Sequence, residues 1–209
     1  MKDNIEINAQ SSIKIMGSDK IFYIDPYLIE KSVNDADYIF ITHEHYDHLS
    51  NDDIGKVIKE DTIIIVPESC YDKVLEFGYP NDIVKVKPNS KYGLEDLTFA
   101  TIPAYNINKL YHTENSCWVG YLIDIDNKKY YITGDTDINK ENKQVKCDVL
   151  FLPVGGVYTM DCEEAALLAN IIKPRFAIPT HYKTVVGNDD DAIKFCELLD
   201  KDIESKILY

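Results

Sequence analysis

Residues 38–48 read YIFITHEHYDH, the most informative stretch of the chain. It opens with an apolar run of the kind that forms a buried strand. His43 and His45 follow two positions apart, so strand alternation points both imidazoles to the same side, as two ligands of one metal ion require. Asp47 and His48 fall in the next turn, where they can face a second position nearby. The stretch therefore predicts a site for one or two metal ions at the end of a buried strand.

Two other interpretations of this cluster explain less. A histidine-rich loop need not bind metal, but three of the chain's five histidines lie between positions 43 and 48, beside a carboxylate. The metalloprotease motif HExxH would need a histidine at position 47, where Asp47 stands instead. Glu44 is therefore not expected to act as the base of a metalloprotease helix.

The rest of the chain is a mixture of expected strands and helices. Expected strands cover residues 5–7, 13–15, 21–24, 62–66, 83–86, 97–101, 118–125, 129–133, 148–153, 175–178 and 206–208. Expected helices cover residues 50–60, 71–77, 161–172 and 192–199. No linker, low-complexity segment or repeat interrupts this order, so we expect one domain over residues 1–209. The mixture predicts an α/β (α+β) fold.

Composition and charge limit the partners of the chain. With 209 residues and 45% hydrophobic content, the chain can bury one full-sized core. Its formal net charge of −14 repels polyanions such as DNA and RNA. We therefore expect a small-molecule substrate and no nucleic acid, while the sequence leaves open whether the protein forms a homo-oligomer.

The sequence also bears on the compartment. No apolar run approaches the ~20 residues needed to cross a bilayer, so no membrane span is expected. Residues 1–6 alternate polar and apolar side chains, unlike a signal peptide, which predicts a cytoplasmic protein. The five cysteines are odd in number and include no CxxC pair, so neither a disulfide framework nor a thiolate zinc site is indicated.

Further polar residues follow other expected strands. Residues 134–137 (GDTD) follow the strand at 129–133, and residues 179–182 (PTHY) follow the strand at 175–178. Open α/β sheets place their sites at the carboxyl ends of strands. Asp135 and His181 therefore become candidates for the same metal site as the histidine cluster.

Taken together, these motifs resemble the metallo-β-lactamase superfamily. The resemblance rests on His43-x-His45-x-Asp47-His48, on Gly134-Asp135-Thr136 and on the late His181, and it spans most of the chain. Residues 25–26 (DP), 153–156 (PVGG) and 158–161 (YTMD) are similar to a small single-domain branch of metal-dependent hydrolases, akin to ascorbate-6-phosphate lactonase. The resemblance implies a four-layer αββα sandwich, the metallo-β-lactamase fold, with the metals at one edge between the sheets.

The resemblance also implies a set of metal ligands. His43 and His45 would bind the first ion, Asp47, His48 and His181 the second, and Asp135 would bridge the two. Where many relatives place a further histidine of the first site, this chain has Asn106. We hypothesise that His112, six residues later on a loop that could fold back, fills that place, with Asn106 beside it or as a weak ligand. An ordinary loop histidine is the alternative for His112.

Other residues near these motifs could assist. Asp25 could orient a ligating histidine or could belong only to an Asp-Pro turn. Tyr105, Tyr158 and Tyr182 flank the predicted site and could donate a hydrogen bond to an oxyanion of the substrate.

The implied activity is metal-dependent hydrolysis. Two divalent metal ions, with Zn expected and Mn or Fe as alternatives, would generate a metal-bound hydroxide that attacks a small lactone or phosphate ester. Asp47 would be the catalytic residue that holds or accepts the proton. Two alternatives stay open, namely an iron-dependent oxidoreductase and a non-catalytic metal-binding protein of the same fold. The second alternative is prompted by Asn106.

Overall fold

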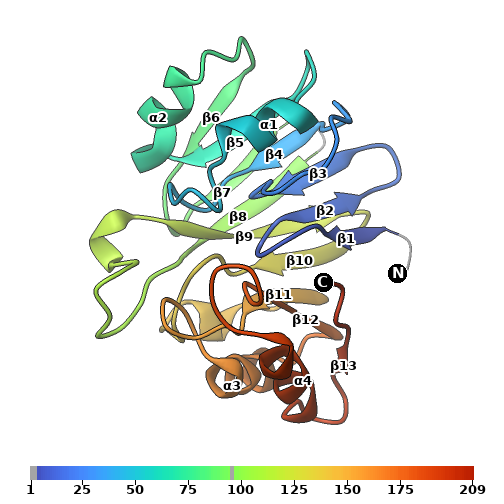
Figure 1. The fold of residues 1–209 in the computed structure, drawn as a ribbon, viewed down its shortest axis with the longest axis vertical. Helices are drawn as coiled ribbons and strands as arrows, with labels where there is room; N and C mark the ends of the chain where they lie inside the picture. The colour runs from blue at the N-terminus through green and yellow to red at the C-terminus, as the bar shows by residue number, and fades with distance from the viewer. Residues whose placement is uncertain (1–3, 95–96) are drawn as a thin grey trace. The chain divides into compact units, whose positions relative to one another are not determined.

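Two compact units, each built on one β-sheet, make up the computed structural model, which describes residues 4–94 and 97–209 (Figure 1). The first unit is Met1–Lys87 with Tyr209, and the second is Pro88–Leu208. Residues 1–3, on which part of the signal-peptide interpretation rests, lie outside the described residues. The expectation of one domain over residues 1–209 stays a prediction.

Within its described residues, the first unit holds a six-stranded sheet in the order β1-β2-β3-β4-β5-β6. The strands are β1 (Ile5–Ile7), β2 (Ile13–Met16), β3 (Ile21–Ile24), β4 (Tyr38–Phe40), β5 (Ile63–Pro67) and β6 (Ile83–Val86). Strands β1 to β3 pair antiparallel, and β3 to β6 pair parallel. Every residue of β4 is buried, as is typical of a parallel strand covered on both faces.

The helices of the first unit follow their capping residues. Helix α1 (Asn51–Val57) begins after Ser50, whose side chain accepts a hydrogen bond from the amide of Asp53. It ends before the expected residue 60, because Ile58 takes an extended conformation. A 3₁₀ turn, η1 (Glu68–Cys70), leads into α2 (Tyr71–Glu76).

The second unit holds a seven-stranded sheet within its described residues, in the order β13-β12-β11-β10-β9-β8-β7. The strands are β7 (Lys91–Leu94), β8 (Leu97–Pro103), β9 (Val119–Ile125), β10 (Lys128–Ile132), β11 (Val149–Pro153), β12 (Phe176–Thr180) and β13 (Glu204–Ser205). Strands β7 to β10 pair antiparallel, and β10 to β13 pair parallel. Asp126 and Asn127 both have positive φ in the hairpin turn between β9 and β10.

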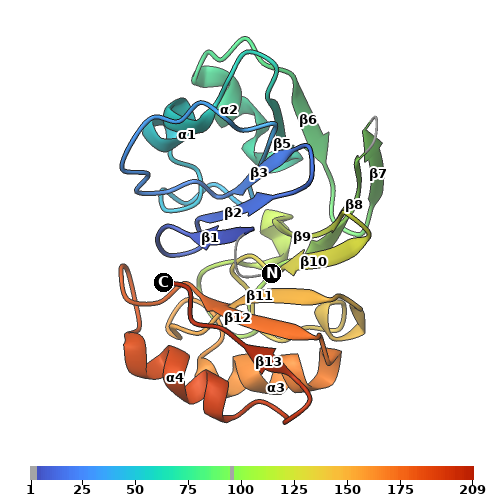
Figure 2. The ribbon, with the colours of Figure 1, turned by 90° about the vertical axis from the view of Figure 1, so that its right-hand side faces the viewer.

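Two helices pack against the parallel part of this second sheet. Helix α3 (Cys162–Ile172) begins at a capping box formed by Asp161 and Glu164, and α4 (Asp189–Glu197) begins at one formed by Asn188 and Asp191. Figure 2 shows the two helices side by side, with α3 contacting β11 and α4 contacting β12. Short 3₁₀ turns, η2 (Glu114–Ser116) and η3 (Asn142–Gln144), lie in the connecting loops.

Most expected elements are present, and the mixed α/β class is confirmed. Helix α4 starts three residues before the expected 192, because Asn188 caps it and the acidic residues form its first turn. The expected strand at 206–208 is wrong: β13 pairs with β12 only at Glu204 and Ser205. The edge strand β7 was missed, because its alternately exposed and half-buried residues give no apolar pattern.

All five cysteines are free thiols. Among the described residues, no helix is long and apolar enough to span a membrane.

Candidate metal centre

In the first unit, the predicted histidines meet just after β4. His43 and His48 are buried and His45 is half-buried. His43 Nε2 lies 3.1 Å from His45 Nδ1, and the ring centroids of His43 and His48 are 3.9 Å apart. Strand alternation brings the first two imidazoles together, and the turn brings back the third. Ring nitrogens gathered in so small a space suit the coordination of a cation.

Asp25 fixes the orientation of His48. Its Oδ2 lies 2.7 Å from His48 Nδ1, and both side chains are fully buried. The amide and hydroxyl of Thr42 donate to the two oxygens of Asp25 at 2.8 and 2.7 Å. Burial raises the pKa of Asp25 above its usual range, although His48 and Thr42 oppose this. An acceptor at Nδ1 favours the tautomer whose lone pair is on Nε2, the form that can bind metal.

Asp47 lies beside His48 and has a neighbour that the sequence did not suggest. Its Oδ2 is 3.6 Å from His48 Nε2 and accepts a long hydrogen bond of 3.5 Å from Gln10 Nε2. Gln10 is fully buried in the turn between β1 and β2, with φ at 54°, and its Oε1 has no hydrogen-bond partner among the described residues. A strained backbone and an unsatisfied buried acceptor are both costly, which marks Gln10 as a candidate functional residue.

In the second unit, two histidines converge on Asp135, which follows β10. His112 Nε2 lies 3.2 Å and His181 Nε2 3.1 Å from the same atom, Asp135 Oδ2. All three side chains are buried, and both histidines have backbone φ in the left-handed region, at 57° and 54°. Sequence spacing alone could not place His112 at Asp135. The ligand roles of these three residues stay predictions.

Asn106 holds the loop that carries His112. The amide of Asn106 donates to His112 O at 2.7 Å, so the loop does fold back. The side-chain Nδ2 of Asn106 donates to the carbonyl oxygens of Tyr111 at 3.0 Å and Tyr158 at 2.6 Å. Its Oδ1 is buried without a hydrogen-bond partner among the described residues. Asn106 therefore acts on His112 through the backbone and keeps one acceptor atom unused.

The flanking tyrosines differ in how they use their polar groups. The hydroxyl of Tyr105 donates to Glu141 at 2.9 Å, and burial together with that carboxylate raises the pKa of Tyr105 to about 12. This hydroxyl is therefore already engaged by a carboxylate. The ring of Tyr158 packs edge-on against Tyr111, and the side chain of Tyr182 is fully buried.

The donor set of each unit fits a divalent cation. Imidazole nitrogens and carboxylate oxygens together are the ligands that Zn, Mn and Fe share. Two buried acceptor atoms, Gln10 Oε1 and Asn106 Oδ1, have no hydrogen-bond donor within the described residues. An unsatisfied buried acceptor is rare in a native protein and is often explained by an ion or water.

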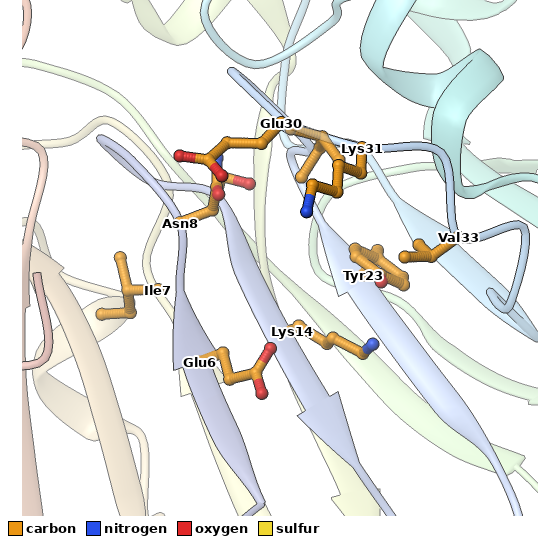
Figure 3. Close-up of a pocket in the computed structure, with 10 residues that line it drawn as sticks. Glu6, Ile7, Asn8, Lys14, Tyr23, Glu30, Lys31 and Val33 are labelled. Carbon is orange, nitrogen blue, oxygen red and sulfur yellow. The ribbon is translucent and has the colours of Figure 1, made fainter.

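A groove on the first unit is a separate feature (Figure 3). It is lined by residues of β1, β2 and β3 and of the segment 29–33, and none of the predicted ligands takes part. Its central cation, Lys14, is paired with Asp35 at 2.7 Å, and the hydroxyl of Tyr23 donates to the same carboxylate at 2.9 Å. Burial raises the pKa of Tyr23 to about 12. These groups satisfy one another, so the groove offers no evident chemistry for a substrate.

Comparison with known proteins decides the family. Residues 4–182 match the family described as the beta-lactamase superfamily domain. The chain belongs to this superfamily. Within the superfamily, it is 31% identical over 170 residues to a UPF0173 metal-dependent hydrolase of Nanoarchaeum equitans, covering 77% of this chain and 75% of that protein. It is 28% identical over 220 residues to one of Listeria welshimeri, covering 98% and 96%.

Solved structures agree with this membership. A protein of Parabacteroides distasonis assigned as a metal-dependent hydrolase superposes with a TM-score of 0.81 at 29% identity, over 97% of this chain and 91% of its own. Igni18, a metallo hydrolase of Ignicoccus hospitalis, superposes with a TM-score of 0.79 at 21% identity, over 97% and 93%, and shows the shared fold. The predicted metallo-β-lactamase fold and metal-dependent hydrolase family are therefore confirmed.

Proposed function

We propose that this chain is a hydrolase that uses two divalent metal ions to cleave a small lactone or phosphate ester. Zn is the proposed metal, with Mn or Fe as alternatives. The proposed ligands are His43, His45 and His112 for one ion, Asp47, His48 and His181 for the other, and Asp135 for both. One observation carries the proposal, namely the convergence of two histidine nitrogens on Asp135 Oδ2.

That convergence supports a bridging role for Asp135. His112 and His181 are assigned to different ions, yet both point at the same carboxylate oxygen. A carboxylate shared by two ions lies between ligands of both, and this arrangement is consistent with that. The contact of His112 with Asp135 also favours the catalytic interpretation over the non-catalytic alternative, which rested on Asn106.

The metal ions and the residues around them have different roles in the proposed hydrolysis. When bound, the metal ions supply Lewis acidity that activates water and polarises the bond to be cleaved. Asp47 Oδ2 accepts the proton that the attacking water loses. Gln10 Nε2 holds this carboxylate in place, and Asp25 keeps His48 in the ligating tautomer. The burial of these side chains limits competing water.

Metal analysis combined with hydrolysis assays tests the proposal. Wild type, Asp135→Ala and His112→Ala are compared for metal content and for turnover of lactones, phosphodiesters and phosphomonoesters. We expect His112→Ala to lose about one metal equivalent, and Asp135→Ala to lose both, with activity at least ~100-fold lower. Asp124→Ala, on β9 of the same unit, is the control and keeps metal and activity. Full metal and activity in Asp135→Ala would show that the site assignment is wrong.

A further inference from the structure

Two loops of the second unit carry large apolar side chains into solvent. Ile107, Leu110 and Tyr111 belong to the loop 106–112, and Val157 belongs to the loop 155–160; we call these four residues the apolar lip. Their exposed fractions are 49%, 93%, 53% and 71%. Single exposed apolar residues need no explanation, but a group on two joined loops is typical of a binding surface.

The two loops are tied together at two points. Asn106 donates to the carbonyl oxygens of both Tyr111 and Tyr158, and the rings of these two tyrosines are 5.2 Å apart. Lys109 donates to Thr159 O at 2.7 Å and is also bound by Asp137. The apolar lip is therefore held in place by buried and half-buried polar contacts, and its side chains project from a fixed base.

Val157 is the most informative residue of the apolar lip. Its φ is 58°, in the left-handed region that disfavours β-branched residues, and its side chain is largely exposed. Neither the backbone nor solvation favours valine here, and asparagine would suit both. Strain of this kind is typical of ligand contacts, where binding repays the cost.

One loop of the apolar lip, residues 106–112, carries the predicted metal ligand His112. Tyr111 directly precedes His112, whose Nε2 lies 3.2 Å from Asp135. Lys109, the lysine of the same loop, is neutralised by Asp137, so the lip offers no unpaired cation to an anionic group. A molecule reacting near His112 would thus place an uncharged, apolar part against the lip.

We propose that the apolar lip binds an alkyl or acyl chain of the substrate, so that the preferred substrate is a lactone or ester with an apolar arm. This inference rests on the proposed function and names the substrate class for the same site. A dissolved molecule is favoured over a lipid surface, because a net charge of −14 repels the anionic surfaces of membranes.

The test measures kcat/KM for lactones and esters with side chains from ethyl to decyl. In the wild type, kcat/KM should rise about fourfold per methylene until the lip is covered, from about 0.8 kcal/mol per buried methylene. In Leu110→Asn and Val157→Asn, kcat/KM should depend less on the length of the side chain, mainly because KM no longer falls as the chain grows. The metal content of both variants should be unchanged. Val157→Asn should also raise the Tm, because asparagine tolerates the left-handed backbone. Leu167→Asn, exposed on α3 of the same unit, is the control and keeps the dependence.

Binding of straight-chain alcohols, followed by calorimetry, tests the lip independently of turnover. Wild type should bind longer alcohols more tightly, and Val157→Asn should lose this trend. If no ester of any length is cleaved while alcohols still bind through the lip, the proposed function fails and this inference stands. Cleavage without any chain-length dependence, or unchanged dependence in both lip variants, overturns this inference alone. Faster cleavage of an ester in anionic vesicles than in solution would overturn it in favour of a lipid surface.

Discussion

Buried polar side chains around the histidines determine which atoms face the site. Asp25 Oδ2 lies 2.7 Å from His48 Nδ1, and the amide of Thr42 donates to Asp25 at 2.8 Å. Gln10 reaches Asp47 from the turn between β1 and β2. The sequence raised Asp25 only as one of two alternatives and gave no signal for Gln10. The local sequence around Asp25 and Gln10 does not indicate that these side chains contact His48 and Asp47.

Replacing Asp25 by asparagine should weaken metal binding. The amide has the same shape but can present a donor to His48 Nδ1, which would favour the wrong tautomer of the imidazole. We expect metal affinity in Asp25→Asn to fall about 10- to 100-fold, as for other residues that orient ligands. Titration with Zn followed by calorimetry measures the change. Asp35→Asn, which disturbs only Lys14 and Tyr23, is the control, and equal affinity in both variants would refute the role of Asp25.

Replacing Gln10 by glycine should separate stability from activity. Glycine relieves the positive φ, worth about 1 kcal/mol, and removes a buried acceptor without a partner, so the Tm should not fall. Asp47 loses its hydrogen-bond donor, so we expect kcat to fall about tenfold. Asn89→Gly makes the matching replacement at another left-handed residue, in an exposed turn, and should leave kcat unchanged. An unchanged kcat in Gln10→Gly would show that the residue is only structural.

At the level of elements, helix α1 fixes the segment that follows β3. The carboxylate of Asp53 accepts hydrogen bonds from the amides of Leu28 at 3.0 Å and Ile29 at 2.9 Å and from Lys56 at 2.9 Å. Burial acts to raise the pKa of Asp53, but these hydrogen bonds and one from Ser50 outweigh it and hold the pKa below its usual value. The start of the helix was predictable from Ser50, whereas the attachment of residues 28–29 was not.

This attachment predicts a pH-dependent contribution to stability. Because the pKa of Asp53 is lower in the folded state, its stabilisation is present above pH ~4 and is lost as the pH falls through the folded value. Asp53→Asn should therefore cost about 2 kcal/mol of unfolding free energy at pH 7 and progressively less in acid. Urea unfolding at several pH values measures the difference. Asp52→Asn, exposed in the same turn, should change little, and a pH-independent loss in Asp53→Asn would contradict the prediction.

For the whole molecule, each unit contributes a sheet and its own set of candidate ligands. The first unit carries the cluster at residues 43–48, and the second carries His112, Asp135 and His181. A metal that binds the folded chain and not the unfolded chain must stabilise the fold by mass action. The unfolding free energy of the protein should therefore increase when metal binds.

Removing metal should lower the thermal stability of the protein. A metal present at 1,000 times its Kd contributes about 4 kcal/mol to the unfolding free energy, so a chelator should reduce the Tm by several degrees. Asp135→Ala should already have the lower Tm, with little further change on chelation. Scanning calorimetry with and without chelator makes the comparison. An identical Tm for metal-loaded and chelated wild type would contradict the proposed site.

From the sequence alone, the approximate positions of most strands and helices and the superfamily could be predicted. These properties depend on apolar period, turn residues and short motifs, all of which are local along the chain. The sequence also marked residues 43–48, Asp135 and His181 as candidate ligands, because each follows a strand. The edge strand β7 and the position of the last strand, β13, could not be predicted, since their apolar patterns are incomplete.

Contacts between side chains far apart in the sequence became visible only in the folded chain. His112 lies against Asp135, Asn106 joins two loops, and Gln10 contacts Asp47 across 37 residues of sequence. The exposure of the apolar lip likewise follows from the folded loops. The physical reason is that such contacts depend on strand pairing and loop conformation, above all on left-handed residues such as His112, which local sequence preference disfavours and the surrounding hydrogen bonds enforce.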